Sequence, residues 1–162
     1  MLFRSTLINR GAALMSQQKF EDALQMFTQA DQASSGGAVA VVDQGIALLA
    51  LNRPEDARAR FQRALQLDPT NIRALFNLGL AHRALGETRE AIEQFEAASR
   101  LDPNDAYIAY FLGVLRFQLG DYAASAEQYQ RAIEIDPVLP SAYFGASRAL
   151  SALNDKIGRA HV

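Results

Sequence analysis

The stretch RALQLDP at residues 63–69 returns in altered form as AASRLDP at 97–103 and as RAIEIDP at 131–137, each copy 34 residues after the last. Proline has no N–H and disfavours helical conformation in the residue before it, so each Asp-Pro pair predicts the end of a helix. A fixed interval of this length indicates a helical repeat. We therefore interpret these aspartates as helix terminators and give them no catalytic role.

The same step of 34 residues connects small and aromatic residues along the chain. Three series are small and one is aromatic: Gly11, Gly45, Gly79 and Gly113; Ala23, Ala57, Ala91 and Ser125; Ala30, Ala64, Ala98 and Ala132; Phe27, Phe61, Phe95 and Tyr129. Small residues let two helix axes approach closely, and the aromatic ring fills the remaining space. Each unit is therefore predicted to be a helical hairpin that stacks on its neighbours. We expect first helices near 5–17, 39–51, 72–85 and 106–119, and second helices near 20–33, 54–67, 88–101 and 122–135.

This pattern resembles the tetratricopeptide repeat (TPR) family, in which small residues, an aromatic residue and a proline recur at fixed places. The resemblance implies an all-α fold, a right-handed α-solenoid of four TPR hairpins plus one additional C-terminal helix. The four units span 4–139, as 4–37, 38–71, 72–105 and 106–139. Ser35 replaces the expected proline of the first unit, which indicates either a looser junction or a functional hinge.

Residues 140–154 continue the phase of the repeat as the first helix of an incomplete fifth unit, or as a cap helix. A turn is expected at Asn154 and Asp155, followed by a non-repeat tail at 155–162. The string IGRAHV at 157–162 is also what one reading frame of a common sequencing adapter encodes. We interpret it as an artefact, with the natural chain continuing; the alternative is a short frayed tail after a cap helix.

Composition excludes several classes of function. The chain has 162 residues, a formal net charge of -2 and no cysteine, so the basic excess typical of nucleic-acid binding and any thiolate metal site are missing. No apolar run is long enough for a membrane span, and none of signal-peptide length appears, which suggests a soluble protein of unknown compartment. Phosphate-binding loops, dinucleotide fingerprints and nucleophile elbows are also missing. We expect no enzyme activity, cofactor or metal.

The remaining polar residues are expected to be structural. His82 is predicted to be a partly buried, hydrogen-bonded packing residue. Pairs spaced i,i+4 predict a solvated helix face: Asp56 with Arg60, Glu96 with Arg100, and Glu127 with Arg131. Polar residues at places that the family keeps apolar or aromatic are expected to be partly exposed: Arg10, Gln44 and Arg116.

The resemblance implies that the first helices line a concave surface. Its candidate partner-binding residues are Val39, Val42, Ile46, Arg73, Phe76, Asn77, Arg83, Tyr107, Tyr110, Phe111, Val114, Phe117 and Phe144. So many apolar side chains favour a sticky groove, because aromatic residues and arginine are enriched at binding hot spots. The alternative is that the middle places of each helix pack between neighbouring helices, which leaves the residues nearer the helix ends accessible.

TPR modules that grip the acidic C-termini of chaperones use a set of Lys, Asn and Arg residues, of which only Arg73 and Asn77 match here. We therefore expect an apolar or amphipathic segment in the groove. The predicted function is a non-catalytic protein–protein interaction scaffold that binds a peptide or protein of unknown identity. One alternative is an accessory arm of a larger multidomain protein, such as an enzyme or a secreted protein, with its activity downstream. The other is self-association as a homo-oligomer through the C-terminal end.

Overall fold

The computed structural model describes residues 2–33 and 37–160, which form nine α-helices and no strand. The chain divides into two compact units, Met1–Glu87 and Thr88–Val162, called unit 1 and unit 2 below. Unit 1 contains α1 (Leu2–Ser16), α2 (Phe20–Gln32), α3 (Ala38–Ala50), α4 (Pro54–Leu67) and α5 (Ile72–Ala84). Unit 2 contains α6 (Thr88–Leu101), α7 (Ala106–Gln118), α8 (Tyr122–Ile135) and α9 (Pro140–Ala160).

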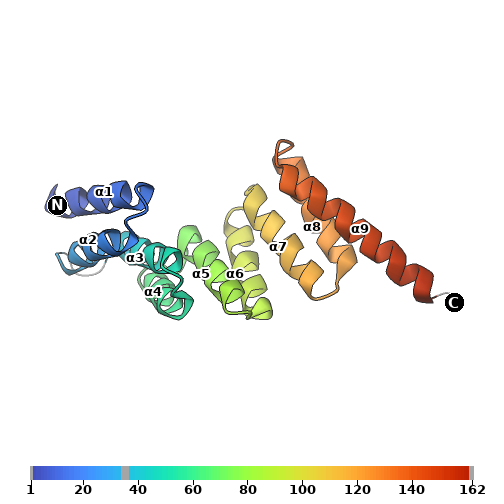
Figure 1. Ribbon diagram of the computed structural model, residues 1–162, viewed down its shortest axis with the longest axis horizontal. Helices are drawn as coiled ribbons and strands as arrows, with labels where there is room; N and C mark the ends of the chain where they lie inside the picture. The colour runs from blue at the N-terminus through green and yellow to red at the C-terminus, as the bar shows by residue number, and fades with distance from the viewer. Residues whose placement is uncertain (1, 34–36, 161–162) are drawn as a thin grey trace. The chain divides into compact units, whose positions relative to one another are not determined.

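Within each unit, helices that follow one another in the chain pack side by side as hairpins (Figure 1). In unit 1, α1 pairs with α2 and α3 with α4, while α2 also contacts α3 and α4 contacts α5. In unit 2, α7 contacts α6 and pairs with α8, and α9 lies against α8 and α7. The all-α architecture is therefore confirmed, and the first eight helices begin and end within three residues of the predicted bounds.

Each Asp-Pro pair ends a helix, as predicted. The helices α4, α6 and α8 stop at the residue before Asp68, Asp102 and Asp136. The aspartate side chain also shapes the loop, because it accepts a hydrogen bond from the backbone N–H two residues ahead. These bonds measure 3.2 Å from Thr70, 3.1 Å from Asn104 and 2.9 Å from Val138. The side chain thus supports the bend that the proline enforces.

The turn inside each hairpin contains one residue with positive φ. Those residues are Gln18, Asn52, Gly86 and Gly120, with φ between 57° and 76°, and they follow the 34-residue step. At Gly86 and Gly120 this left-handed conformation carries no steric cost. The next position in the series, Asn154, does not form a turn, because α9 continues without interruption to Ala160.

The length of α9 differs from the prediction of a helix ending at Asn154. Residues 155–160 contain no proline, and they include Lys156 and Arg159, which extend helices readily. The chain stays helical through the expected turn, although Gly158 is a poor helix former. The tail is helical as far as Ala160, and the rest of it lies outside the described residues.

The core of three hairpins is a contact between glycine and an aromatic ring, namely Gly11 with Phe27, Gly45 with Phe61 and Gly113 with Tyr129. A Cβ placed on Gly45 would clash with the ring of Phe61, and one on Gly113 would lie about 2.9 Å from ring atoms of Tyr129. The two rings are buried at 0% and 4% exposure. The predicted pairing of small and aromatic residues is therefore confirmed, and it fixes which face of each helix remains outside.

The first junction, where Ser35 stands, lies outside the described residues. Of the helices that the structure does describe, none combines the length and apolar character needed to cross a membrane.

Candidate functional site

In unit 1, the predicted contact residues differ widely in how much surface they expose. Val39 is 49% exposed, whereas Val42 is only 1% exposed and belongs to the core with Phe61. Ile46 and Phe76 are half-buried. Val42 has almost no surface left for a partner, so we remove it from the candidate set.

Arg73 and Asn77 are held by bonds within unit 1. Arg73 Nη2 lies 2.7 Å from Oδ1 of Asp43, whose carboxylate is almost fully buried. Burial raises the pKa of Asp43 above its ordinary value, although the charge of Arg73 and its hydrogen bond act in the opposite direction. Asn77 Nδ2 donates to the carbonyl oxygen of Arg73 at 2.7 Å. Asp43 already neutralises the charge of Arg73, so a partner's carboxylate would compete with Asp43 for that charge.

Four aromatic residues of unit 2 contact one another. The Phe111 ring stacks on Phe95 with centroids 5.4 Å apart, and Tyr110 meets Phe111 edge-on at 5.3 Å. Tyr110 also lies 5.8 Å from the ring of Tyr129. Tyr110, Phe111 and Val114 are half-buried, which agrees with packing of the middle places between neighbouring helices.

Another group of unit 2 residues remains at the surface. Tyr107 on α7 is 56% exposed and Phe144 on α9 is 66% exposed, while Phe117 on α7 is half-buried. The guanidinium carbon of Arg148, on α9, lies 4.8 Å from the centre of the Phe117 ring and 5.7 Å from that of Phe144. We call these four residues the α7–α9 face.

Sequence reasoning missed Arg148. The repeat phase was available to find it, because Arg148 follows Phe144 by four residues, as Val114 follows Tyr110. Residues four apart share one helix face. The candidate list stopped at Phe144, although the same phase continues along α9.

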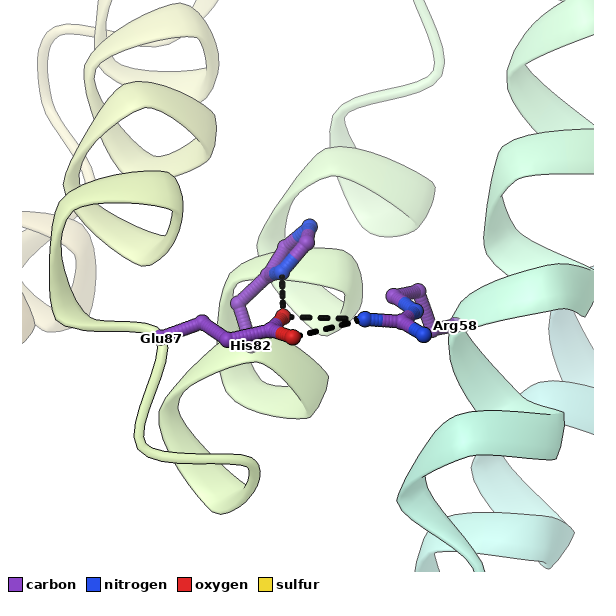
Figure 2. A network of polar contacts seen from close by, with 3 residues as sticks. All are labelled: Arg58, His82 and Glu87. Atoms are coloured by element: carbon purple, nitrogen blue, oxygen red, sulfur yellow. Dashed lines mark hydrogen bonds and ion pairs between the residues drawn. The ribbon is translucent and has the colours of Figure 1, made fainter.

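His82 lies in a polar network inside unit 1. It is 8% exposed, and its Nδ1 is 2.6 Å from Oε2 of Glu87. Arg58 Nη1 donates to both carboxylate oxygens of Glu87, at 2.8 and 3.1 Å. Figure 2 shows the Glu87 carboxylate between the His82 ring and the Arg58 guanidinium. Because a carboxylate only accepts, the proton lies on Nδ1 of His82.

This network holds the turn after α5 and the helix α4 together. The hydrogen bond from His82, followed by that from Arg58 and the positive charge, lowers the pKa of Glu87, although desolvation acts in the opposite direction. Each charged group already has a partner. The prediction that His82 is a hydrogen-bonded packing residue is therefore confirmed.

The predicted i,i+4 pairs find other partners. Asp56 pairs with Arg53 at 2.6 Å, and Glu96 pairs with Arg116 at 2.7 Å. Arg131 donates to the carbonyl oxygen of Pro103 at 2.8 Å. These partners lie on the preceding turn, on another helix or in the α6–α7 loop, so an i,i+4 spacing could not identify them.

The predicted partial exposure of Gln44 is wrong. Its side chain is 1% exposed and donates to the carbonyl oxygen of Phe27 at 3.2 Å and to Oδ2 of Asp31 at 3.4 Å. A buried amide needs such partners, because an unpaired one would cost about 1–3 kcal/mol. Arg10 is exposed and Arg116 half-buried, as expected.

Unit 2 has hollows whose linings contain none of the four residues of the α7–α9 face. One of about 580 Å³ opens between the α7–α8 turn and the second half of α9. It is lined by Leu119, Gly120, Asp121, Tyr122, Ala123, Leu153, Lys156 and Ile157. No group of three or more His, Cys, Asp or Glu residues suited to a metal ion occurs in the part of the chain that the structure describes.

Comparison with known families agrees with the hairpin geometry. Family models described as tetratricopeptide repeat match residues 14–64 and 79–140, and one described as TPR repeat matches 45–86, so matches run from residue 14 to residue 140. The chain belongs to the tetratricopeptide repeat family. No curated protein matches this TPR chain in sequence.

Solved structures of TPR proteins superpose on most of the chain. The crystal structure of MamA has a TM-score of 0.83 and 22% identity over 94% of this chain and 83% of its own. YrrB, described as a TPR protein with an unusual peptide-binding site, has a TM-score of 0.78 and 25% identity over 89% of this chain and 74% of its own. A tetratricopeptide repeat protein from Parabacteroides merdae has a TM-score of 0.83 and 17% identity over 96% and 62% of the two chains.

Proposed function

We propose that this TPR protein is a non-catalytic interaction scaffold that binds a peptide or an amphipathic segment on its first helices. The observation that carries the proposal is the exposure of Tyr107 and Phe144 on the α7–α9 face, at 56% and 66%. Aromatic side chains bury a large area when they bind, and they are enriched at the centres of protein interfaces. Two exposed aromatic side chains on adjacent helices can therefore form a contact surface for a protein partner.

The rigidity of the face also supports binding. Tyr107 and Phe144 stand on packed helices, where Ala106, Ala109 and Ala142 belong to one buried cluster. A surface that is already ordered loses little conformational entropy when a partner arrives. YrrB has a peptide-binding site, and the shared fold makes peptide recognition a reasonable expectation for this chain.

The polar residues support a scaffold rather than an enzyme. The His82, Glu87 and Arg58 side chains bond to one another and connect two helices, which is a structural task. The accessory-arm and self-association alternatives stay predictions.

The test uses peptides selected for binding to the protein from a displayed random library. We expect Tyr107→Ala combined with Phe144→Ala to weaken binding of a selected peptide by at least about tenfold, a typical effect of removing interface anchors. The matched control is Leu101→Ala combined with Val138→Ala, which truncates exposed apolar residues elsewhere in unit 2. Fluorescence anisotropy measures affinity, and circular dichroism verifies that both variants remain helical.

Chemical shifts in ¹⁵N-labelled protein locate the bound peptide. Shifts concentrated on α7 and α9 would agree with the proposal. If the double variant binds as tightly as the control, or if the shifts lie on the second helices, the proposed face is wrong.

A further inference from the structure

The guanidinium of Arg148 lies against two aromatic rings and has no anionic partner. Its carbon is 4.8 Å from the Phe117 ring centre on α7 and 5.7 Å from the Phe144 ring centre on α9. It forms no ion pair or hydrogen bond with any residue in 2–33 or 37–160. Its side chain is exposed, so a partner could reach it.

The other arginine on α7 and the first half of α9 is neutralised. Over α7 and the first half of α9, the charged residues are Arg116 and Arg148. Arg116 lies 2.7 Å from Glu96 and 3.7 Å from Asp121. Arg148 is therefore the positive charge that this part of unit 2 presents to a partner.

Aromatic rings prepare a guanidinium for a carboxylate. Rings cover its flat faces through cation–π contact, while its N–H donors point outward around the edge. Two of those donors match the two oxygens of a carboxylate. Where a ring takes the place of water against such a face, a bond made at the edge is stronger than one made by a fully hydrated arginine.

We infer that Arg148, held against Phe117 and Phe144, binds a carboxylate of a peptide whose neighbouring residues are apolar. The inference rests on the proposed function and specifies the chemistry of its partner. The carboxylate is either an Asp or Glu side chain or the C-terminus of the peptide. Its apolar neighbours would contact the exposed rings of Tyr107 and Phe144.

The charge of unit 2 favours a single carboxylate over a polyanion. In residues 88–162 the acidic side chains outnumber the basic ones. The resulting field repels nucleic acid and other polyanions, which need several cations close together. One unpaired arginine beside aromatic rings can bind one carboxylate whose neighbouring residues in the peptide are apolar.

The test uses an array of octapeptides built from Leu, Phe, Ser and Gly in permuted order. Each peptide is made in matched forms that contain either Asp or Asn, with a free or an amidated C-terminus. We expect the wild-type protein to bind the carboxylate form at least about tenfold more tightly than the matching amide. The form that gives the preference shows which carboxylate is recognised.

Variants then connect the preference to Arg148. Arg148→Gln should remove the preference while amidated Asn peptides still bind, and Arg148→Lys should keep only part of it, because lysine lacks the bidentate fork. Arg89→Gln is the control, since it removes an equal charge from an exposed position of unit 2. Each preference is a ratio measured on one protein sample, so a loss of folded protein does not change it.

The outcomes separate this inference from the proposed function. If carboxylate and amide peptides bind equally, but Tyr107→Ala with Phe144→Ala weakens both, the face binds peptides and the role of Arg148 is wrong. The role of Arg148 is also wrong if Arg148→Gln and Arg89→Gln reduce the preference for the carboxylate form equally. It is wrong as well if a single-stranded oligonucleotide binds through Arg148 more tightly than any peptide does. If the wild-type protein binds no peptide of the array, this inference is overturned, while the proposed function is decided by the peptides selected from the displayed library.

Discussion

Glu87 joins two helices of unit 1 through one carboxylate, which accepts hydrogen bonds from both His82 and Arg58. Its folded-state pKa is lowered, so ionised Glu87 favours the folded protein. That contribution is complete above the ordinary pKa of 4.5 and is lost as the pH falls through the lower folded-state pKa.

We expect Glu87→Gln to lower the melting temperature at neutral pH, because the amide cannot accept the charge-assisted bonds of the carboxylate. The difference from the wild type should shrink below about pH 4.5 as the wild-type carboxyl protonates. Thermal melts from pH 3 to pH 8 measure both effects.

Glu55→Gln is the control for this substitution, since Glu55 is an exposed acid on α4. Equal melting temperatures for the two variants across the pH range would contradict the stabilising role of the network.

At the scale of helices, the hairpin depends on the close approach that glycine permits. We expect Gly45→Leu to displace the buried Phe61 ring and to lower the free energy of unfolding by roughly 1–3 kcal/mol or more, as overpacking does. Ala59→Leu adds similar bulk at an exposed position of the same hairpin and should change stability by less than about 0.5 kcal/mol. Urea titration measures both, and equal stabilities would show that α3 and α4 do not meet at Gly45.

The helices themselves could be predicted because their boundaries are local. Asp68 and Pro69 end α4 by backbone chemistry alone, and the turn at Gly120 needs only one residue with positive φ. The partners of polar side chains could not be predicted, because they depend on which helices meet. Gln44 bonds to a backbone carbonyl of α2, and a carbonyl has no signature in the sequence.

The candidate site could be predicted only in part, because its contacts also depend on which helices meet. Repeat phase placed Tyr107 and Phe144 on the first helices, where the structure leaves them exposed. It could not separate Val42 from Val39, because burial is decided by the neighbouring helix. The contact of Arg148 with Phe117 depends on how α9 lies against α7, which one sequence does not state.

For the whole molecule, stability should be distributed unit by unit. In repeat proteins each hairpin contacts its neighbours in the chain, so a local defect stays local. We expect Gly45→Leu to speed amide hydrogen exchange mainly in α3 and α4, and Gly113→Leu, which displaces Tyr129, mainly in α7 and α8. Exchange read by mass spectrometry on peptic fragments tests this; a uniform acceleration through both units would indicate a single cooperative fold.

The buried amide of Gln44 makes the first two hairpins non-interchangeable. Its donor group satisfies the backbone oxygen of Phe27, and it lies beside the carboxylate of Asp31. A hairpin with an apolar residue at that place would lose this hydrogen bond to the oxygen of Phe27. One polar side chain, Gln44, therefore makes the second hairpin specific for the first hairpin as its neighbour.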